Sequence, residues 1–147
     1  MIDIGPMTWS ERRWVSSSWK RAILGQKRRT LIEELIQDLV DTQRILVARP
    51  ETDRSVGVGW VCFTPEPARR ILHYVYVRGG GDGVRGLGFA RQLLAAAGIN
   101  TTIPVATTAN RPRDLDRARR NNVQLEWVDP RELLRRQVAA HPTGEQP

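Results

Sequence analysis

Residues 71–97 read ILHYVYVRGGGDGVRGLGFARQLLAAA, and this stretch decides the fold. Residues 71–77 are almost entirely apolar or aromatic, which predicts a buried strand. Residues 85–97 have the pattern of an amphipathic helix that stops at Gly98, a residue typical of helix ends. The glycine-rich segment between them ends at the helix N-terminus, where unpaired N–H groups and the macrodipole attract anions. Glycines there let the backbone approach a phosphate closely, so the stretch predicts a binding site for a phosphorylated ligand.

The chain before this stretch predicts one strand, two helices and two further strands. Residues 2–4 alternate and stop at Gly5-Pro6, as a short strand would. Helices are expected over residues 8–22 and from residue 30 to about 41, and strands over residues 44–49 and 56–63. Candidate core residues of the two helices are Trp9, Trp14, Val15, Trp19, Ile23, Leu31, Ile32, Leu35, Ile36, Leu39 and Val40.

After the stretch we expect a strand over residues 103–108, an arginine-rich helix over 114–121, a strand over 123–128 and a helix from Pro130. The length fits a single domain over residues 1–139 with a disordered tail over 140–147. The element order predicts the α/β (α+β) class, with a mixed central sheet flanked by helices and three strands in a meander before residue 78.

The composition is basic, with a net charge of +7 and a pI of about 10.9. An anionic ligand or partner therefore fits, although the arginine clusters at residues 27–29 and 111–120 fit a solvated surface better than nucleic-acid binding. The single cysteine, Cys62, lies in an apolar run and is expected to be a buried hydrophobe. No run approaches the roughly 20 apolar residues of a membrane span, and no signal-peptide pattern is present, so we expect a cytoplasmic protein. We assign no metal site.

The element order and the pattern Arg85-x-x-Gly88-x-Ala90 resemble the GNAT superfamily of acyl-coenzyme A-dependent N-acyltransferases. The resemblance in the order of helices and strands spans nearly all of residues 2–128, whereas the motif itself covers about 20 residues. The string VRGLG at residues 84–88 is similar to one in the histone-acetyltransferase branch. Residues 14–19, WVSSSW, and 72–77, LHYVYV, also resemble small GNAT-fold proteins of bacteriophages and prophages. The resemblance implies transfer of an acetyl or other acyl group from acetyl-coenzyme A to an amine of a protein or small molecule.

The resemblance also implies where the cofactor lies. The pantetheine would run along Tyr76 and Val77 like an added strand, and an N–H there would polarise the thioester carbonyl. Asn110, with Thr107 and Thr108, would hydrogen-bond the cofactor or a water molecule. The coenzyme A pyrophosphate would rest on the backbone N–H groups of Val84, Arg85, Gly86, Leu87, Gly88, Phe89 and Ala90.

The proton chemistry has fewer candidates. His73 has the pKa range of a base, and Tyr74 or Tyr76 could relay a proton, although all three also fit a structural role. Because strand residues alternate between faces, His73 is not expected to share a face with both tyrosines. Glu66 is a further candidate base. The chain departs from the family in having no acid on residues 71–77 and no tyrosine after Tyr76.

Other interpretations remain open. Gly81-x-Gly83-x-x-Gly86 has the glycine spacing of a dinucleotide site, but it follows a late strand and no acid occurs between Gly83 and Asp114. A phosphate-binding P-loop is excluded, because no glycine-lysine-serine/threonine sequence occurs. The glycines could also form an ordinary strand-to-helix turn. The main functional alternative is a catalytically inactive GNAT-fold protein that binds a host protein or nucleic acid through its basic surfaces.

Overall fold

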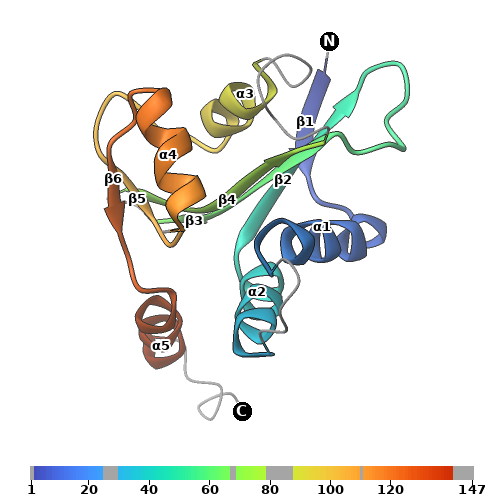
Figure 1. Cartoon of the computed structure of the whole chain (residues 1–147). Helices are drawn as coiled ribbons and strands as arrows, with labels where there is room; N and C mark the ends of the chain where they lie inside the picture. Colours follow the sequence, from blue (N-terminus) through green and yellow to red (C-terminus); the bar gives the residue numbers. More distant parts are fainter. Residues whose placement is uncertain (1, 25–29, 67–68, 79–87, 110, 141–147) are drawn as a thin grey trace.

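The computed structural model describes residues 2–24, 30–66, 69–78, 88–109 and 111–140. Its centre is one six-stranded sheet in which the strands follow one another in chain order (Figure 1). The first four strands are antiparallel, and the last two run parallel to the fourth. The strands are β1 (Ile2–Pro6), β2 (Arg44–Pro50), β3 (Gly59–Pro65), β4 (Arg70–Val77), β5 (Val105–Thr107) and β6 (Leu125–Trp127).

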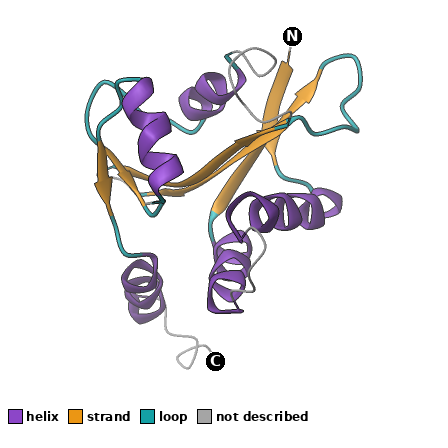
Figure 2. Ribbon diagram, viewed as in Figure 1, coloured by secondary structure: helices purple, strands orange, loops and turns teal. Residues whose placement is uncertain are grey.

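Helices cover both faces of this sheet, as Figures 1 and 2 show. One face carries α1, α2 and α5, and the other carries α3 and α4. This arrangement confirms the predicted mixed sheet flanked by helices, including the three-strand meander. The helices are the 3-10 turn η1 (Trp9–Glu11), α1 (Arg12–Leu24), α2 (Thr30–Thr42), α3 (Phe89–Ala96), α4 (Pro112–Arg120) and α5 (Pro130–Ala140).

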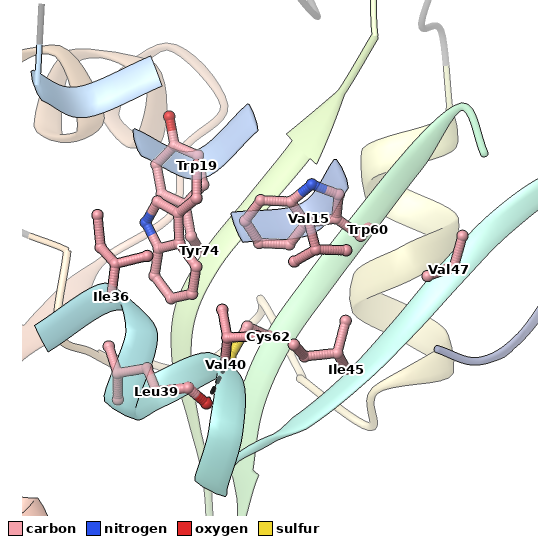
Figure 3. Packing of buried hydrophobic residues seen from close by; sticks show 10 residues of the cluster. All are labelled: Val15, Trp19, Ile36, Leu39, Val40, Ile45, Val47, Trp60, Cys62 and Tyr74. Carbon is pink, nitrogen blue, oxygen red and sulfur yellow. Dashed lines mark hydrogen bonds between the residues drawn. The ribbon is translucent and has the colours of Figure 1, made fainter. Parts of the chain in front are cut away.

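The core beneath α1 and α2 is built around aromatic rings (Figure 3). Trp60 of β3 is fully buried and lies 5.2 Å from Trp19 of α1, ring centroid to centroid. Tyr74 of β4 stacks on Trp19 at 5.9 Å with only 13° between the ring planes. The indole N–H of Trp60 donates to the Ser18 hydroxyl at 2.9 Å, so its one polar group is satisfied. Cys62 is buried in this cluster, which raises the pKa of its thiol and fits the predicted role of a small hydrophobe.

The core on the opposite face lies under α3. Leu93 of α3 has no exposed surface and packs against Val61 and Phe63 of β3. α3 ends as predicted, with Gly98 in the left-handed region at φ 74°. The sheet is therefore buried on both faces, which explains why β3 and β4 have nearly continuous apolar sequences.

Some predicted core residues are exposed. The side chain of Trp9 is 83% exposed, because the regular helix begins only at Arg12 and the preceding 3-10 turn faces Trp9 outward. Leu31 in the first turn of α2 is 69% exposed. The strand predicted from Val56 begins at Gly59 instead, since Val56 donates its N–H to the Asp53 carbonyl in a turn. α5 includes Ala140, which we had assigned to the tail, and residues 141–147 lie outside the described residues.

The prediction that His73 cannot share a face with both tyrosines is wrong. The pairing of β3 with β4 shifts register, so that Cys62 pairs with Tyr74 and Phe63 with Leu72. His73 is the extra residue of a β-bulge between these pairs, and a bulge interrupts the alternation of side chains. His73 therefore contacts Thr64, on the α2 side of the sheet, while Tyr74 and Tyr76 pack on the same side against Trp60.

Candidate functional site

The strands β4 and β5 separate after a short parallel contact. Only Ile71 and Leu72 of β4 pair with β5, and the N–H of Thr108 adds one hydrogen bond of 3.0 Å to the Leu72 carbonyl. β4 then continues to Val77, while β5 ends at Thr107. In the described part of the chain, no strand pairs with this edge of β4 beyond Leu72. Among the described residues, the backbone of β4 beyond Leu72 thus has a strand partner on the β3 side alone.

Helix α3 packs against the end of β4. Leu93, in the second turn of α3, packs beside Gly59, and Gly59 pairs with Val77 at the end of β4. Gly88 caps the helix in the left-handed region, with φ 80° and ψ −15°, and its carbonyl accepts the N–H of Gln92 at 2.8 Å. This conformation favours glycine, and the first N–H groups of a helix have no partner within the helix.

The predicted cofactor residues are only partly within the described chain. Tyr76 and Val77 lie at the end of β4, and Phe89 and Ala90 form the first turn of α3, half-buried against the core. Val77 is buried in the core cluster under α3, and Phe89 and Ala90 pack against the same cluster, whereas the ring of Tyr76 packs on the opposite face of the sheet. The remaining cofactor residues, Val84, Arg85, Gly86, Leu87 and Asn110, lie outside the described residues.

His73 is almost fully buried near this edge, with 1% of its surface exposed. Its Nε2 lies 2.7 Å from the Thr64 hydroxyl, and its Nδ1 lies 2.8 Å from the Thr108 hydroxyl. The Thr64 hydroxyl donates to the Gln43 side chain, so it must accept from Nε2–H. In a neutral ring with this proton on Nε2, Nδ1 is unprotonated and accepts a hydrogen bond from the Thr108 hydroxyl.

Burial lowers the pKa of His73 to about 4. The ring is therefore neutral at physiological pH, in agreement with the tautomer that the hydrogen bonds require. His73 touches no open space directly, but its partner Thr108 is half-exposed where β4 and β5 separate. Any effect of His73 on a ligand must consequently pass through the Thr108 hydroxyl.

Tyr74 and Tyr76 belong to the aromatic core rather than to an open site. Tyr76 stacks on Trp60 at 5.8 Å and meets Trp14 edge to face at 6.2 Å, and it stays half-buried. Tyr74 is 9% exposed, and burial, followed by the charge of Asp114, raises the pKa of its hydroxyl. Both rings are thus held by aromatic packing.

Arg111 is a site residue that sequence reasoning missed. Its guanidinium donates to the Tyr74 hydroxyl at 3.5 Å and to the carbonyls of Ala22 and Ile23 at 3.2 and 3.4 Å. It also contacts Asp114, which accepts the Arg111 backbone N–H at 3.2 Å and caps α4. The sequence carried a local signal for the cap, an acid three residues after Arg111 and a proline at the first helical position. Nothing in it indicated the contact with α1.

Glu66, the further candidate base, lies away from this edge. It lines a surface cavity together with Arg70 and Val105, which are the first residues of β4 and β5. That cavity is at the opposite end of β4 from Val77. Glu66 is therefore not a base for chemistry at the exposed edge.

Among the described residues, no group of three or more His, Cys, Asp or Glu side chains could hold a metal ion. The same residues include no helix with the length and apolar character that crossing a membrane requires.

No protein-family model matches the sequence, and a search of curated proteins finds no match. Similarity appears instead among solved structures. The aminoglycoside N-acetyltransferase AAC(6')-Iy in complex with CoA is 14% identical, with a TM-score of 0.53 over 86% of this chain and 88% of that chain. The same enzyme with a bisubstrate analogue matches at 14% identity and a TM-score of 0.53, over 86% of this chain and 91% of that chain.

Two other structures complete the comparison. A Corynebacterium glutamicum protein described as histone acetyltransferase HPA2 and related acetyltransferase is 16% identical, with a TM-score of 0.52 over 81% of this chain and 82% of that chain. A Desulfovibrio desulfuricans protein described as an acetyltransferase of the GNAT family is 18% identical, with a TM-score of 0.45 over 65% of this chain and 62% of that chain. At these identities the likeness is one of architecture: this chain has the GNAT acetyltransferase fold.

Proposed function

We propose that the protein is an N-acetyltransferase that moves an acetyl group from acetyl-coenzyme A to an amine by direct attack. The observation that carries the proposal is the edge of β4 beyond Leu72, with which no strand of the described chain pairs, together with α3, which begins after Gly88 and packs against the end of β4. A strand-like pantetheine suits the edge, and a pyrophosphate suits the helix N-terminus. AAC(6')-Iy, which has the same fold, was solved in complex with CoA, and this supports the choice of cofactor.

In the proposed complex, pantetheine hydrogen-bonds the backbone of Tyr76 and Val77. The pyrophosphate accepts hydrogen bonds from the N–H groups of residues 84–90, with Asn110 as a further donor. Positive charge from Arg85 and from the helix dipole would offset the two phosphate charges. These roles are carried over from the resemblance to GNAT enzymes, and the start of α3 directly after Gly88 supports them.

The amine would attack the thioester carbonyl carbon, and a backbone N–H of Tyr76 or Val77 would stabilise the negative oxygen. Collapse of the intermediate breaks the carbon–sulfur bond, and the amine proton must leave. In this proposal the proton passes to solvent through a water molecule at the Thr108 hydroxyl, and His73 positions that hydroxyl. The hydroxyl donates to Nδ1, so its oxygen can accept a hydrogen bond from the amine or from the water. With a pKa of about 4, His73 orients this hydroxyl more effectively than it stores a proton.

The tyrosines have different proposed roles. Tyr76 contributes its backbone to the cofactor edge and its ring to the core. Tyr74 keeps its proton and contacts Arg111, which makes its hydroxyl a candidate donor to the departing thiolate through water. The acceptor amine, the acyl chain, the cytoplasmic location and the phage origin stay predictions.

A second candidate is a GNAT-fold protein that binds a partner without catalysis. Two observations favour it: His73 is sealed from the edge except through Thr108, and Arg113, Arg119 and Arg120 are exposed on α4. An arginine-rich surface of this kind suits an anionic protein or nucleic acid, and such binding would weaken steeply with salt.

Calorimetric titration with acetyl-coenzyme A tests the first candidate. We expect a dissociation constant in the micromolar range and a higher melting temperature with cofactor, since a ligand that binds only the folded state stabilises it. Gly88→Glu should weaken binding by at least about 100-fold, a free-energy difference of about 2.7 kcal/mol. A side chain there adds negative charge beside the pyrophosphate and is strained at φ 80°.

Gly98→Glu is the matched control, because Gly98 ends the same helix with a similar φ of 74°. It should cost similar stability and leave cofactor affinity unchanged. Equal affinity of both variants for acetyl-coenzyme A would contradict the assignment of Gly88 to the pyrophosphate site. Absence of binding by the folded wild-type protein at millimolar cofactor would reject the first candidate in favour of the second.

A further inference from the structure

A groove between α2 and α5 lies on the face of the sheet away from α3. Its apolar residues are Leu31 and Leu35 of α2 and Leu134 and Val138 of α5. The side chains of Leu31 and Val138 are 69% and 65% exposed, which is unusual for large apolar residues that lie together. The proposed acetyl transfer uses no residue of this groove.

The two walls of the groove carry opposite charges. Glu34 and Asp38 stand on the α2 wall, and Arg131 and Arg135 stand on the α5 wall. Between residues that the structure describes, no ion pair crosses the groove, and Arg135 pairs instead with Glu132 on its own helix at 2.7 Å. The acidic wall and the basic wall thus both face outward beside the apolar floor.

We propose that this α2–α5 surface binds a second copy of the same chain in a two-fold symmetric dimer. In such a contact residue i of one copy meets residue j of the other, and j meets i. The acidic wall of each copy then meets the basic wall of its partner, while Leu31 and Val138 are covered. A partner of a single charge sign would be repelled by one wall, so the alternation of charge favours the chain itself.

The size of the surface predicts a weak dimer. α2 has 13 residues, which makes it about 20 Å long at 1.5 Å per residue. A patch about 20 Å on each side buries roughly 800 Å² in total over both copies, below the roughly 1,600 Å² of a standard interface. We expect a monomer–dimer equilibrium with a dissociation constant of about 1 to 100 μM.

Sedimentation velocity from about 1 to 300 μM tests the proposal, with the wild-type chain expected to shift from monomer to dimer. Leu31→Gln/Val138→Gln should raise the dissociation constant at least about 10-fold, because the covered apolar area is lost. Both side chains are mostly exposed, so the variant should keep its monomer stability. Ile103→Gln, at an exposed apolar residue on the other end of the sheet, is the control and should dimerise as the wild type does.

Charge reversal gives the sharper test. Glu34→Arg/Asp38→Arg makes both walls basic, and Arg131→Glu/Arg135→Glu makes both walls acidic. Each variant alone should stay monomeric at 300 μM, and an equimolar mixture should form a heterodimer. The changes are on exposed helix positions, and circular dichroism checks that each variant is folded.

A wild-type chain that stays monomeric to 300 μM overturns the proposal, and the groove then serves a different partner. Dimerisation that survives both charge reversals or Leu31→Gln/Val138→Gln also overturns it, because the contact then lies elsewhere. Failure of acetyl-coenzyme A binding has no bearing on these outcomes.

Discussion

At the scale of single residues, His73 shows how a bulge changes the environment of a side chain. The extra residue in β4 directs His73 toward Thr64 and Thr108, and both ring nitrogens find a hydroxyl partner. Burial then disfavours the charged ring, since the imidazolium would lose its hydration and gain no anionic partner here. The residue is a neutral hydrogen-bonding element inside the sheet.

The first residue-scale prediction concerns the titration of this ring. His73 should titrate near pH 4 in the folded protein, against about 6.5 in the unfolded chain. The unfolded state therefore binds a proton first, and about 3 kcal/mol of stability is present above pH 6.5 and lost as pH falls to about 4. Proton NMR of the two histidine rings measures the pKa directly.

His141→Gln leaves one histidine signal and so assigns the other. His73→Gln should flatten the stability change between pH 6.5 and 4, whereas His141→Gln should not. A His73 signal that titrates near pH 6.5 in the folded protein would contradict the neutral, sealed ring.

At the scale of elements, the contact of β3, β4 and α3 depends on one small residue. A Cβ added at Gly59 would lie 2.7 Å from the Tyr76 carbonyl oxygen and 3.2 Å from Leu93. The carbonyl belongs to the paired strand and cannot move aside without disturbing the ladder. Gly59 thus allows α3 to approach the end of β4 where the cofactor edge is proposed.

Gly59→Ala should destabilise the protein by about 1 to 3 kcal/mol, the usual cost of overpacking a filled core. Urea unfolding measures this change. Gly5→Ala in the edge strand β1 is the control, because its Cβ would meet only Arg49, at 3.5 Å, in ordinary contact. We expect a change of less than about 1 kcal/mol there. Equal effects of the two substitutions would contradict the close approach at Gly59.

At the scale of the whole molecule, one ion pair joins the sheet to the helical layer. Arg49 of β2 is 8% exposed, and its guanidinium meets Glu11 of η1 at 2.5 and 2.8 Å. Glu11 also accepts the N–H of Thr8 at 2.9 Å, so one carboxylate fixes both the sheet contact and the start of the helix. Burial alone would raise the Glu11 pKa, but the hydrogen bonds from Arg49 and Thr8 outweigh it and lower the pKa.

Glu11→Gln should cost about 3 kcal/mol at pH 7, because it leaves the buried Arg49 charge without its anion. Since the folded-state pKa of Glu11 is lowered, its contribution is complete above about pH 4.5 and is lost as pH falls through the folded value. Urea unfolding at pH 7 and pH 3 should therefore show a smaller difference between variant and wild type at pH 3.

Asp41→Asn removes the carboxylate partner of Arg12 in a pair that is about one-third exposed, with side-chain exposures of 28% and 43%. It should cost less than about 1 kcal/mol, because solvent screens such pairs. Comparable losses in the two variants would show that the Glu11–Arg49 pair has no special role in joining the layers.

Much of the fold was predictable because it depends on local patterns. The apolar run at residues 71–77 predicted β4, and Gly98 predicted the end of α3. The same local reasoning failed at Trp9, where a 3-10 turn precedes the helix and changes which way the side chain faces. Hydrophobic periodicity predicts that a helix is present, but it does not show at which residue the regular helix begins.

Some features of the candidate site follow from local sequence, and others depend on contacts between distant segments. A glycine at the start of a helix and a strand before it are local features, so Gly88 and the edge at Val77 could be predicted from the sequence. His73 and Thr108 could each be singled out, but their hydrogen bond spans 35 positions in the chain. It depends on the parallel pairing of β4 with β5, which no local pattern encodes.

The sequence by itself determined the order of elements and the α/β (α+β) class, because hydrophobic periodicity and helix-ending glycines act within a few residues. Only the tertiary structure decided the bulge at His73, the separation of β4 from β5 and the bridge from Arg111 to α1. Each of these features depends on which distant segment of the chain packs beside the residue or strand concerned. Strand register and long-range hydrogen bonds are set by the packing of the whole sheet.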